Sequence, residues 1–351
     1  MFSKLSFKKL ALIAAPALML AGCGGSGGAS ASRDFVWAVG SSTVYPFANV
    51  AAESFSATNA GMKTPKIEST GTGGGIERFC SGIGAGTPDI VNASRRMKAK
   101  EFESCAANGV TDIIEVQLGI DGIALGESVN GPRFALTQED IYKALAANPY
   151  GQPNTARTWR DVNPALPAVE IAVYGPPSTS GTYDAFKELI LGKGCEANTE
   201  MKALKDSDKD RYEAVCHTLR GAPAYVEQGE NDNLIVQKLA QNPNYLGVFG
   251  FSYLDANRTT IRDVPIAGVE ATAATIADGS YPGSRPLYIY IKKQHIGVIP
   301  GLQQYLKALI EAAAPGGALS QRGLIPLGAD IYATQLKATD DLPLLVKDGL
   351  K

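Results

Sequence analysis

Residues 36–55 read VWAVGSSTVYPFANVAAESF and join a short apolar run, a turn of glycine and hydroxyl residues, and a helix pattern. The apolar run Val36–Val39 predicts a buried strand that ends at Gly40. After the turn, apolar residues recur at helical spacing from Val44 to Phe55. A strand, a glycine turn and an amphipathic helix in this order form the first half of a β-α-β unit.

The same arrangement follows at once in the chain. Residues 66–69 predict a second strand, and after a run of glycines the apolar residues from Ile76 to Ile83 share one helical face. Residues 89–92 predict a third strand, which ends at Ala93-Ser94-Arg95-Arg96. The order β-α-β-α-β predicts a parallel sheet covered by helices, whose ligands gather beyond the carboxyl ends of the strands.

Three loops rich in glycine, serine and threonine each precede a helix pattern. They are Gly40-Ser41-Ser42-Thr43, Ser69-Thr70-Gly71-Thr72-Gly73-Gly74-Gly75 and Ser178-Thr179-Ser180-Gly181-Thr182. A helix start offers unpaired N–H groups and the positive end of the dipole, and hydroxyls add further donors. Serine and threonine are also ordinary N-caps, so one such loop is weak evidence. Three of them predict a pocket for a small oxyanion.

The first residues predict an export signal. Lys4, Lys8 and Lys9 precede an apolar run, Leu10–Leu20, that is too short for a bilayer span of about 20 residues. The run ends in Leu20-Ala21-Gly22-Cys23, which resembles a bacterial lipobox, so we expect cleavage before Cys23 and a lipid on that residue. The alternative is an ordinary signal peptide with a chance cysteine. Residues 1–22 are therefore the expected signal and residues 23–33 a flexible tether.

The mature chain is long enough for two lobes and is mildly acidic. Removing 22 of 351 residues leaves 329, and single cores rarely exceed about 250–300 residues. Without the three signal lysines, 30 basic residues face 35 acidic ones, a net charge of −5. No long basic run is present, which argues against a nucleic-acid partner. An anion would have to be bound by local donors.

Four cysteines besides Cys23 predict two disulfides in an exported protein. The sequence permits three pairings, and the local pairs Cys80–Cys105 and Cys195–Cys216 are the simplest. A zinc site is the alternative, but the chain has no CxxC motif and only two histidines, His217 and His295. We therefore expect no metal.

The rest of the chain predicts a second lobe and a return to the first. Two apolar strands, residues 113–118 and 122–125, should make the crossing. We expect the first lobe at residues 34–121 and 246–351, and the second at 122–245. Residues 202–213 predict one exposed charged helix, and residues 246–253 a strand that leads back.

Arg95 follows the third predicted strand and is the candidate that would grip two oxygens of the anion at once. Arg96 is the alternative, but neighbouring residues on an extended chain face opposite ways. Either arginine could instead form a surface ion pair.

Nucleotide binding and hydrolysis are poorly supported. The Gly71–Gly75 loop lacks the Gly-Lys-Ser/Thr ending of a P-loop, and the dinucleotide spacing is not matched. A serine hydrolase needs a base near its hydroxyl, and neither His217 nor His295 has a partner visible in the sequence. A metal phosphatase needs clustered Asp and His residues. We expect no cofactor and no catalysis.

Taken together, these motifs resemble the periplasmic phosphate-binding proteins of bacterial phosphate ABC importers, the PstS family. The resemblance covers nearly the whole mature chain, and its motifs are Gly40–Pro46, Thr72–Gly75, Ala93-Ser94-Arg95, Ser180-Gly181-Thr182, Asn242–Gly247 and Ser284–Tyr290. It implies the two-lobed α/β fold of periplasmic binding proteins. Each lobe is a mostly parallel sheet flanked by helices, the lobes are joined by crossover strands, and phosphate is enclosed between them.

The resemblance also implies the ligand contacts. They are Ser42, Thr43, the backbone N–H of Val44, Thr72, Arg95, Ser180, Gly181 and Thr182. Many family members have an aspartate after the third strand that accepts the proton of phosphate, whereas here Arg95 stands at that position. Asp232 is the first candidate for this acceptor, and Glu227 and Asp121 are the next candidates. Asp232 could instead simply cap a helix.

We therefore expect a monomeric, lipid-anchored receptor in the periplasm or at the cell surface that delivers inorganic phosphate to a membrane permease. The first alternative is the same architecture for another oxyanion, such as sulfate or a phosphonate. The others are an exported phosphatase and a surface sensor or adhesion protein.

Overall fold

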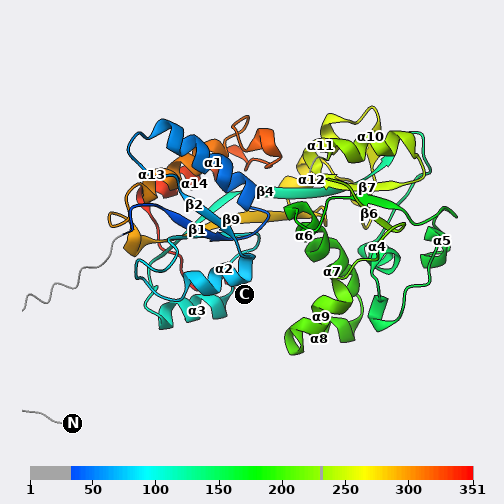
Figure 1. The fold of residues 1–351 in the computed structure, drawn as a ribbon, viewed down its shortest axis with the longest axis horizontal. Helices are drawn as coiled ribbons and strands as arrows, with labels where there is room; N and C mark the ends of the chain where they lie inside the picture. The colour runs from blue at the N-terminus through cyan, green and yellow to red at the C-terminus, as the bar shows by residue number, and fades with distance from the viewer. Residues whose placement is uncertain (1–32, 230–231, 351) are drawn as a thin grey trace, which may run out of the picture. The chain divides into compact units, whose positions relative to one another are not determined.

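The computed structural model describes residues 33–229 and 232–350 (Figure 1). The predicted signal, the lipid-bearing Cys23 and all but the last residue of the tether lie outside the described residues. The strands are β1 (Trp37–Gly40), β2 (Lys66–Ser69), β3 (Ile90–Ala93), β4 (Ile113–Ser128), β5 (Val173–Gly175), β6 (Tyr225–Glu227), β7 (Leu246–Gly250), β8 (Ile261–Asp263) and β9 (Ser284–Lys292).

In the described chain, each of these strands is followed in sequence by a helix. The helices are α1 (Tyr45–Thr58), α2 (Thr72–Phe79), α3 (Ala99–Ala107), α4 (Gln138–Leu145), α5 (Trp159–Val162), α6 (Gly181–Phe186), α7 (Gly192–Cys195), α8 (Thr199–Ser207), α9 (Lys209–Cys216), α10 (Asn233–Gln241), α11 (Phe251–Ala256), α12 (Ala273–Ala277), α13 (Leu302–Ala312) and α14 (Ala329–Asp341). Shorter helical segments are η1 (Pro149–Gly151), η2 (Lys187–Leu191), η3 (Lys293–His295) and η4 (Ser320–Arg322). None of the described helices is both long and apolar enough to cross a bilayer.

The first three strands form the parallel sheet that the sequence predicts. Strand β1 lies between β2 and β3 and is parallel to both, and β9 pairs antiparallel with β3. Side chains alternate between the two faces, so Ala38 and Ile90 pack with α1 and α13, whereas Val39 and Val91 pack with α2 and α3. Helices therefore cover both faces of this sheet (Figure 1).

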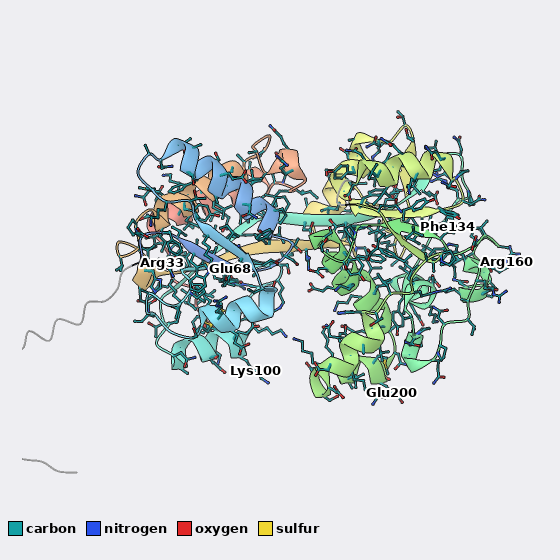
Figure 2. The ribbon with its side chains drawn as sticks, viewed as in Figure 1. Arg33, Glu68, Lys100, Phe134, Arg160 and Glu200 are labelled. Atoms are coloured by element: carbon teal, nitrogen blue, oxygen red, sulfur yellow. A yellow bond between two sulfur atoms is a disulfide. The ribbon has the colours of Figure 1, made fainter. Side chains whose placement is uncertain are left out.

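The second half is built around the parallel strands β5, β6 and β7, with β7 antiparallel to β4. Its core runs from Ile120 to Tyr281 in sequence, with Leu327 added from near the carboxyl end. Phe134 belongs to this core, and Figure 2 shows it in the other half of the molecule from Glu68 of β2. This packing differs from the expected return to the first lobe at residue 246, because α11, β8 and α12 still contribute to the second core.

Strands β4 and β9 connect the two halves (Figure 1). Residues Ile113–Gln117 of β4 pair with β9, a bulge follows between Gln117 and Gly119, and Ile123–Glu127 pair with β7. The two separate strands predicted over residues 113–125 are therefore one continuous strand. The predicted crossover strands are present, and the α/β architecture with a mostly parallel sheet in each half is confirmed.

Two other predicted elements are wrong in detail. The strand expected over residues 246–253 ends at Gly250, where α11 begins, and the single charged helix expected over residues 202–213 is split into α8 and α9. The split occurs at Asp208, whose extended backbone and side chain cap the start of α9. Two disulfides join Cys80 to Cys105 and Cys195 to Cys216, the local pairs expected from the spacing.

Candidate anion-binding site

The loop after β1 places its hydroxyls at the start of α1. Ser41 Oγ accepts the N–H groups of Thr43 (3.2 Å) and Val44 (3.4 Å), so this donor pair already has an internal acceptor. Pro46 fits the first turn of α1, where its missing N–H costs nothing. The side chains of Ser42 and Thr43 are left to reach other parts of the chain.

The loops after β1 and β2 touch because both carry glycine. A Cβ on Gly75 would lie 2.5 Å from the Cα of Gly40, and Gly40 itself has a φ of 128° that favours glycine. Thr72 begins α2 here, and its Oγ1 lies 3.0 Å from the Oγ of Ser94, which follows β3. The Ser94 N–H also donates to Thr72 Oγ1 (3.1 Å). Ser94, which is absent from the predicted ligand set, therefore lies in hydrogen-bond contact with Thr72 of the second loop.

The third loop, before α6, contacts the first loop directly. Thr43 Oγ1 lies 3.5 Å from the carbonyl oxygen of Gly181. A Cβ on Gly181 would lie 2.9 Å from the backbone carbonyl oxygen of Ser42. Ser180 caps α6 by accepting the Thr182 N–H at 3.2 Å. Asp184, in the first turn of α6, accepts a hydrogen bond from Ser42 Oγ at 2.5 Å. Loops 142 residues apart in sequence thus meet.

Arg285 of β9 provides a buried positive charge beside this contact. Its side chain is 6% exposed, and its Nη2 donates to Thr43 Oγ1. The guanidinium also pairs with Asp121 of β4 (3.4 Å) and with Glu188 of η2. Burial raises the pKa of Asp121, against the opposing effect of Arg285. In the sequence, Arg285 falls only within the family motif Ser284–Tyr290, and its place beside the loops was not predicted.

The hydrogen bonds of the Arg95 side chain are made to residues outside the three loops. Its guanidinium forms a two-pronged ion pair with Glu101 of α3 (2.7 and 2.9 Å), and its side chain is 37% exposed. Arg96 forms the corresponding pair with Glu115 of β4. The alternative of a surface ion pair therefore describes both arginines in this structure.

The predicted proton acceptors have other partners. Asp232 is buried at the start of α10, and its Oδ2 accepts the N–H of Gly250 at 3.1 Å. Asp121 is engaged by Arg285, and Glu227 is exposed on β6. Asp184, which was not among the predicted acceptors, accepts a hydrogen bond from the predicted ligand residue Ser42.

A hollow of about 280 Å³ lies next to Arg285, lined by residues that include Gln117 and Tyr288 of the crossover strands. It contains none of the residues predicted from the three loops, so we locate the site at the loop contacts instead. Within the described residues, no group of three or more His, Cys, Asp or Glu residues could hold a metal ion.

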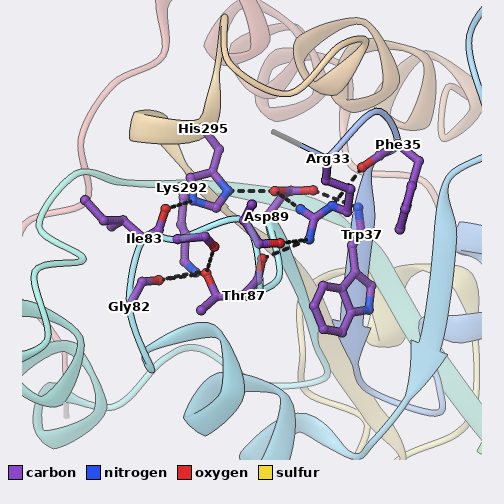
Figure 3. A network of polar contacts seen from close by, with 11 residues as sticks. Arg33, Phe35, Trp37, Gly82, Ile83, Thr87, Asp89, Lys292 and His295 are labelled. Atoms are coloured by element: carbon purple, nitrogen blue, oxygen red, sulfur yellow. Dashed lines mark hydrogen bonds and ion pairs between the residues drawn. The ribbon is translucent and has the colours of Figure 1, made fainter. Parts of the chain in front are cut away.

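A second polar cluster, which we call the Asp89 cluster, lies at the opposite, amino-terminal ends of β1 and β3 (Figure 3). Asp89 pairs with Arg33, accepts the Trp37 N–H (2.7 Å) and lies 2.6 Å from His295 Nδ1. Lys292 donates to Gly82 O (2.6 Å) and Thr87 Oγ1 (2.8 Å), and the second His295 nitrogen meets Ile83 O. These groups satisfy one another away from the loops.

The contacts at the loops suit recognition of a small anion and offer little for catalysis. The hydroxyls of Ser42 and Thr43 lie close to the buried guanidinium of Arg285, and hydroxyl and guanidinium groups are donors from which a tetrahedral oxyanion accepts. The histidines are elsewhere: His217 pairs with Glu213, and His295 belongs to the Asp89 cluster. Neither is in hydrogen-bond contact with a loop hydroxyl in the described residues.

Comparison with known proteins reveals relatives along most of the chain. A family model described as a PBP superfamily domain matches residues 25–312. The phosphate-binding protein PstS of Staphylococcus saprophyticus is 30% identical over 342 residues, covering 95% of this chain and 93% of that protein. Protein SphX of Synechococcus elongatus is 30% identical over 318 residues, covering 88% and 82%.

Solved structures agree with the sequence relatives. The crystal structure of "a possible phosphate binding protein from Planctomyces limnophilus DSM 3776" superposes with a TM-score of 0.72 at 27% identity. It covers 88% of this chain and 98% of the other. An ABC-type phosphate transport receptor from Vibrio cholerae, 19% identical with a TM-score of 0.56, shares the fold.

Proposed function

This chain belongs to the PBP superfamily and, within it, to the family of its PstS relatives, and from this we propose that it captures inorganic phosphate between two lobes and delivers it to an ABC permease. The relatives named for phosphate binding are matched over nearly their full length, so the proposal concerns the whole chain.

The contact between the first and third loops is the observation that carries the proposal. Ser42 and Thr43 from one half meet Gly181 and Asp184 from the other, so a ligand held by both loops would bridge the halves. Backbone and hydroxyl donors each contribute about 0.5–1.5 kcal/mol net, and several are needed for tight binding of one small ion. We propose as phosphate ligands Ser42, Thr43, the Val44 N–H, Thr72, Ser180, Gly181 and Thr182, with Ser94 added.

We propose that Arg285 supplies the main positive charge, with Arg95 as a secondary candidate. Arg285 is buried against Thr43, where a charge-assisted bond is strong, whereas Arg95 is partly exposed and already paired. Asp232 remains a candidate for contact with phosphate, although its bond to Gly250 supports a structural role.

We propose that the protein binds phosphate without catalysing a reaction and that it acts outside the cytoplasm. We propose that Cys23 carries a lipid that anchors the chain to a membrane, and that the receptor is a monomer. We also propose that residues 34–121 and the chain from β9 onward form one lobe. The second lobe would then extend from residue 122 to about Tyr281, since the second core continues that far.

Calorimetric titration of the full chain in detergent micelles tests the proposal. The protein is first unfolded and refolded to remove any bound ligand, and phosphate and sulfate are then titrated separately. We expect tight phosphate binding and no sulfate binding. Binding of sulfate alone would show that the ligand is an oxyanion other than phosphate. Turnover of a chromogenic phosphate ester would indicate a phosphatase.

A further inference from the structure

The helix that begins at the third loop contains an irregular turn. One uninterrupted helix runs through α6, η2 and α7, and η2 is a π-helical turn within it (Figure 1). The N–H of Gly192 donates to the carbonyl of Lys187, five residues earlier. Gln138 of α4 donates to the carbonyl of Leu189 inside the turn at 2.6 Å. Such turns are rare and often lie at functional sites, and this one presents Glu188 from a backbone that is held in place.

Glu188 reaches across to Arg285 of β9. Its Oε2 accepts a hydrogen bond from Arg285 Nη1 at 2.5 Å. A second carboxylate, that of Asp121 on β4, lies 3.4 Å from Arg285 Nε. The remaining nitrogen, Nη2, donates to Thr43 Oγ1. All three nitrogens of the guanidinium are therefore engaged by the protein itself.

Two carboxylates around one guanidinium leave a local excess of negative charge. Burial raises the pKa of Asp121, and the charge of Glu188 adds to that rise while Arg285 opposes it. An incoming phosphate dianion would meet the same like-charge repulsion and would find the donors of Arg285 occupied. The guanidinium can therefore serve an anion only after one of the two carboxylates has left.

Glu188 is the carboxylate that can leave. Its side chain is 55% exposed, whereas that of Asp121 is 15% exposed and lies on the strand paired with β9. An ion pair with an exposed partner is weak, so solvent can receive Glu188 at little cost. Burial opposes the raised pKa of Arg95, which its pair with Glu101 and the charge of Glu188 produce. A second cation therefore lies close enough to interact with Glu188 once it has left Arg285.

We propose that Glu188 makes an autoinhibitory contact: its carboxylate occupies Arg285 in the ligand-free receptor and moves into solvent when phosphate binds to that guanidinium. The inference rests on the proposed function. Phosphate then replaces one anionic partner of Arg285 by another, so the buried guanidinium keeps a partner throughout. Only the fraction of molecules in which Glu188 has moved out is competent to bind, which lowers the apparent affinity for phosphate.

Calorimetric titration of the refolded full chain with phosphate tests the proposal. Glu188→Gln keeps the length of the side chain and removes its charge. We expect phosphate to bind this variant about 3- to 10-fold more tightly than the wild type, the ratio for release of one partly exposed ion pair. A residue that only positions Arg285 would give the opposite sign, because its loss would weaken binding. Glu200→Gln, the same change at an exposed position of α8, is the matched control and should bind like the wild type.

Glu188→Asp separates occupation of Arg285 from general charge repulsion. The variant keeps the negative charge, but its side chain is one methylene shorter and no longer reaches the guanidinium. It should therefore bind phosphate more tightly than the wild type, whereas repulsion alone would leave the affinity unchanged. Thermal unfolding verifies that each variant is folded, and saturating phosphate should raise the unfolding temperature more in Glu188→Gln than in the wild type.

Three results would overturn the proposal. They are unchanged or weaker phosphate binding in Glu188→Gln, an equal gain in Glu200→Gln, and wild-type affinity in Glu188→Asp. A wild-type chain that binds no phosphate instead refutes the proposed function, so the two failures are distinguishable.

Discussion

The Asp89 cluster and the loop cluster are both polar groupings at the ends of the same parallel strands, yet they are built differently. In the Asp89 cluster, the charged groups pair within one half of the molecule and are buried from solvent. In the loop cluster, the contacts join the two halves and include side chains such as Asp184 and Glu188 that are partly exposed. A closed network favours stability, and a network with replaceable partners favours binding.

The largest expected effect is on stability, from Asp89→Ala. The change leaves Arg33 and His295 without their buried carboxylate, which should lower the free energy of unfolding by about 3–5 kcal/mol. Urea denaturation measures this loss, and calorimetry should show unchanged phosphate affinity in the folded variant. The control Asp206→Ala should stay within about 0.5 kcal/mol of the wild type. A weakened phosphate affinity in Asp89→Ala would mean that the two clusters are coupled.

Next in size is the difference between the two arginines. Arg285→Met should lower phosphate affinity by about 2–3 kcal/mol, because it removes a buried charge-assisted donor. Arg95→Met should cost less than about 1 kcal/mol, because Arg95 is partly exposed and already paired with Glu101. Calorimetry on both variants gives the two losses directly. Equal losses, or a larger one for Arg95, would restore Arg95 as the main anion-binding charge.

The last effect is a pH dependence of stability that arises in the Asp89 cluster. Burial lowers the pKa of Lys292 to about 7, and the nearby charge of Asp89 offsets this only in part. Between pH 7 and the ordinary pKa of lysine, near 10.4, the unfolded chain therefore binds one more proton than the folded chain. This lysine should make stability rise with pH in that range, by up to about 1.4 kcal/mol per pH unit, and become constant below pH 7.

Lys292→Met removes this contribution while keeping an apolar stem. Urea denaturation at several pH values from 7 upward should show a shallower rise in the variant than in the wild type. Parallel curves for the two proteins would show that Lys292 is charged in the folded state.

Much of the fold is predictable from local patterns, and the exceptions have a common cause. The β-α-β order, the helix starts and the crossover strands all follow from apolar periodicity and glycine turns. The continuity of β4 was missed because Gly119 and Gly122 look like chain breaks. In the structure a Cβ at Gly119 would lie 2.8 Å from Leu324, and one at Gly122 would lie 3.0 Å from Ile276. These glycines allow close packing inside a strand, a reason that only the folded chain reveals.

The same distinction between local sequence patterns and contacts between distant residues applies to the site. The three loops are recognisable from their own residues, because each is a helix start. Asp184 and Arg285 carry no such signal: their partners Ser42 and Thr43 lie 142 and 242 residues away in sequence. Arg95 illustrates the opposite error, since its position after β3 is correct but Glu101, six residues later, takes its guanidinium.

The order in which the core residues occur along the chain has a consequence for how an exported protein of this kind folds. The second core is assembled almost entirely from residues between Ile120 and Tyr281. The two cores around β1 and β3 also need β9, and one of them needs α13, which come near the end of the chain. When the amino terminus emerges first, the strands that open the sequence must therefore wait for the last third of the chain. The half that begins the sequence is the last to be finished.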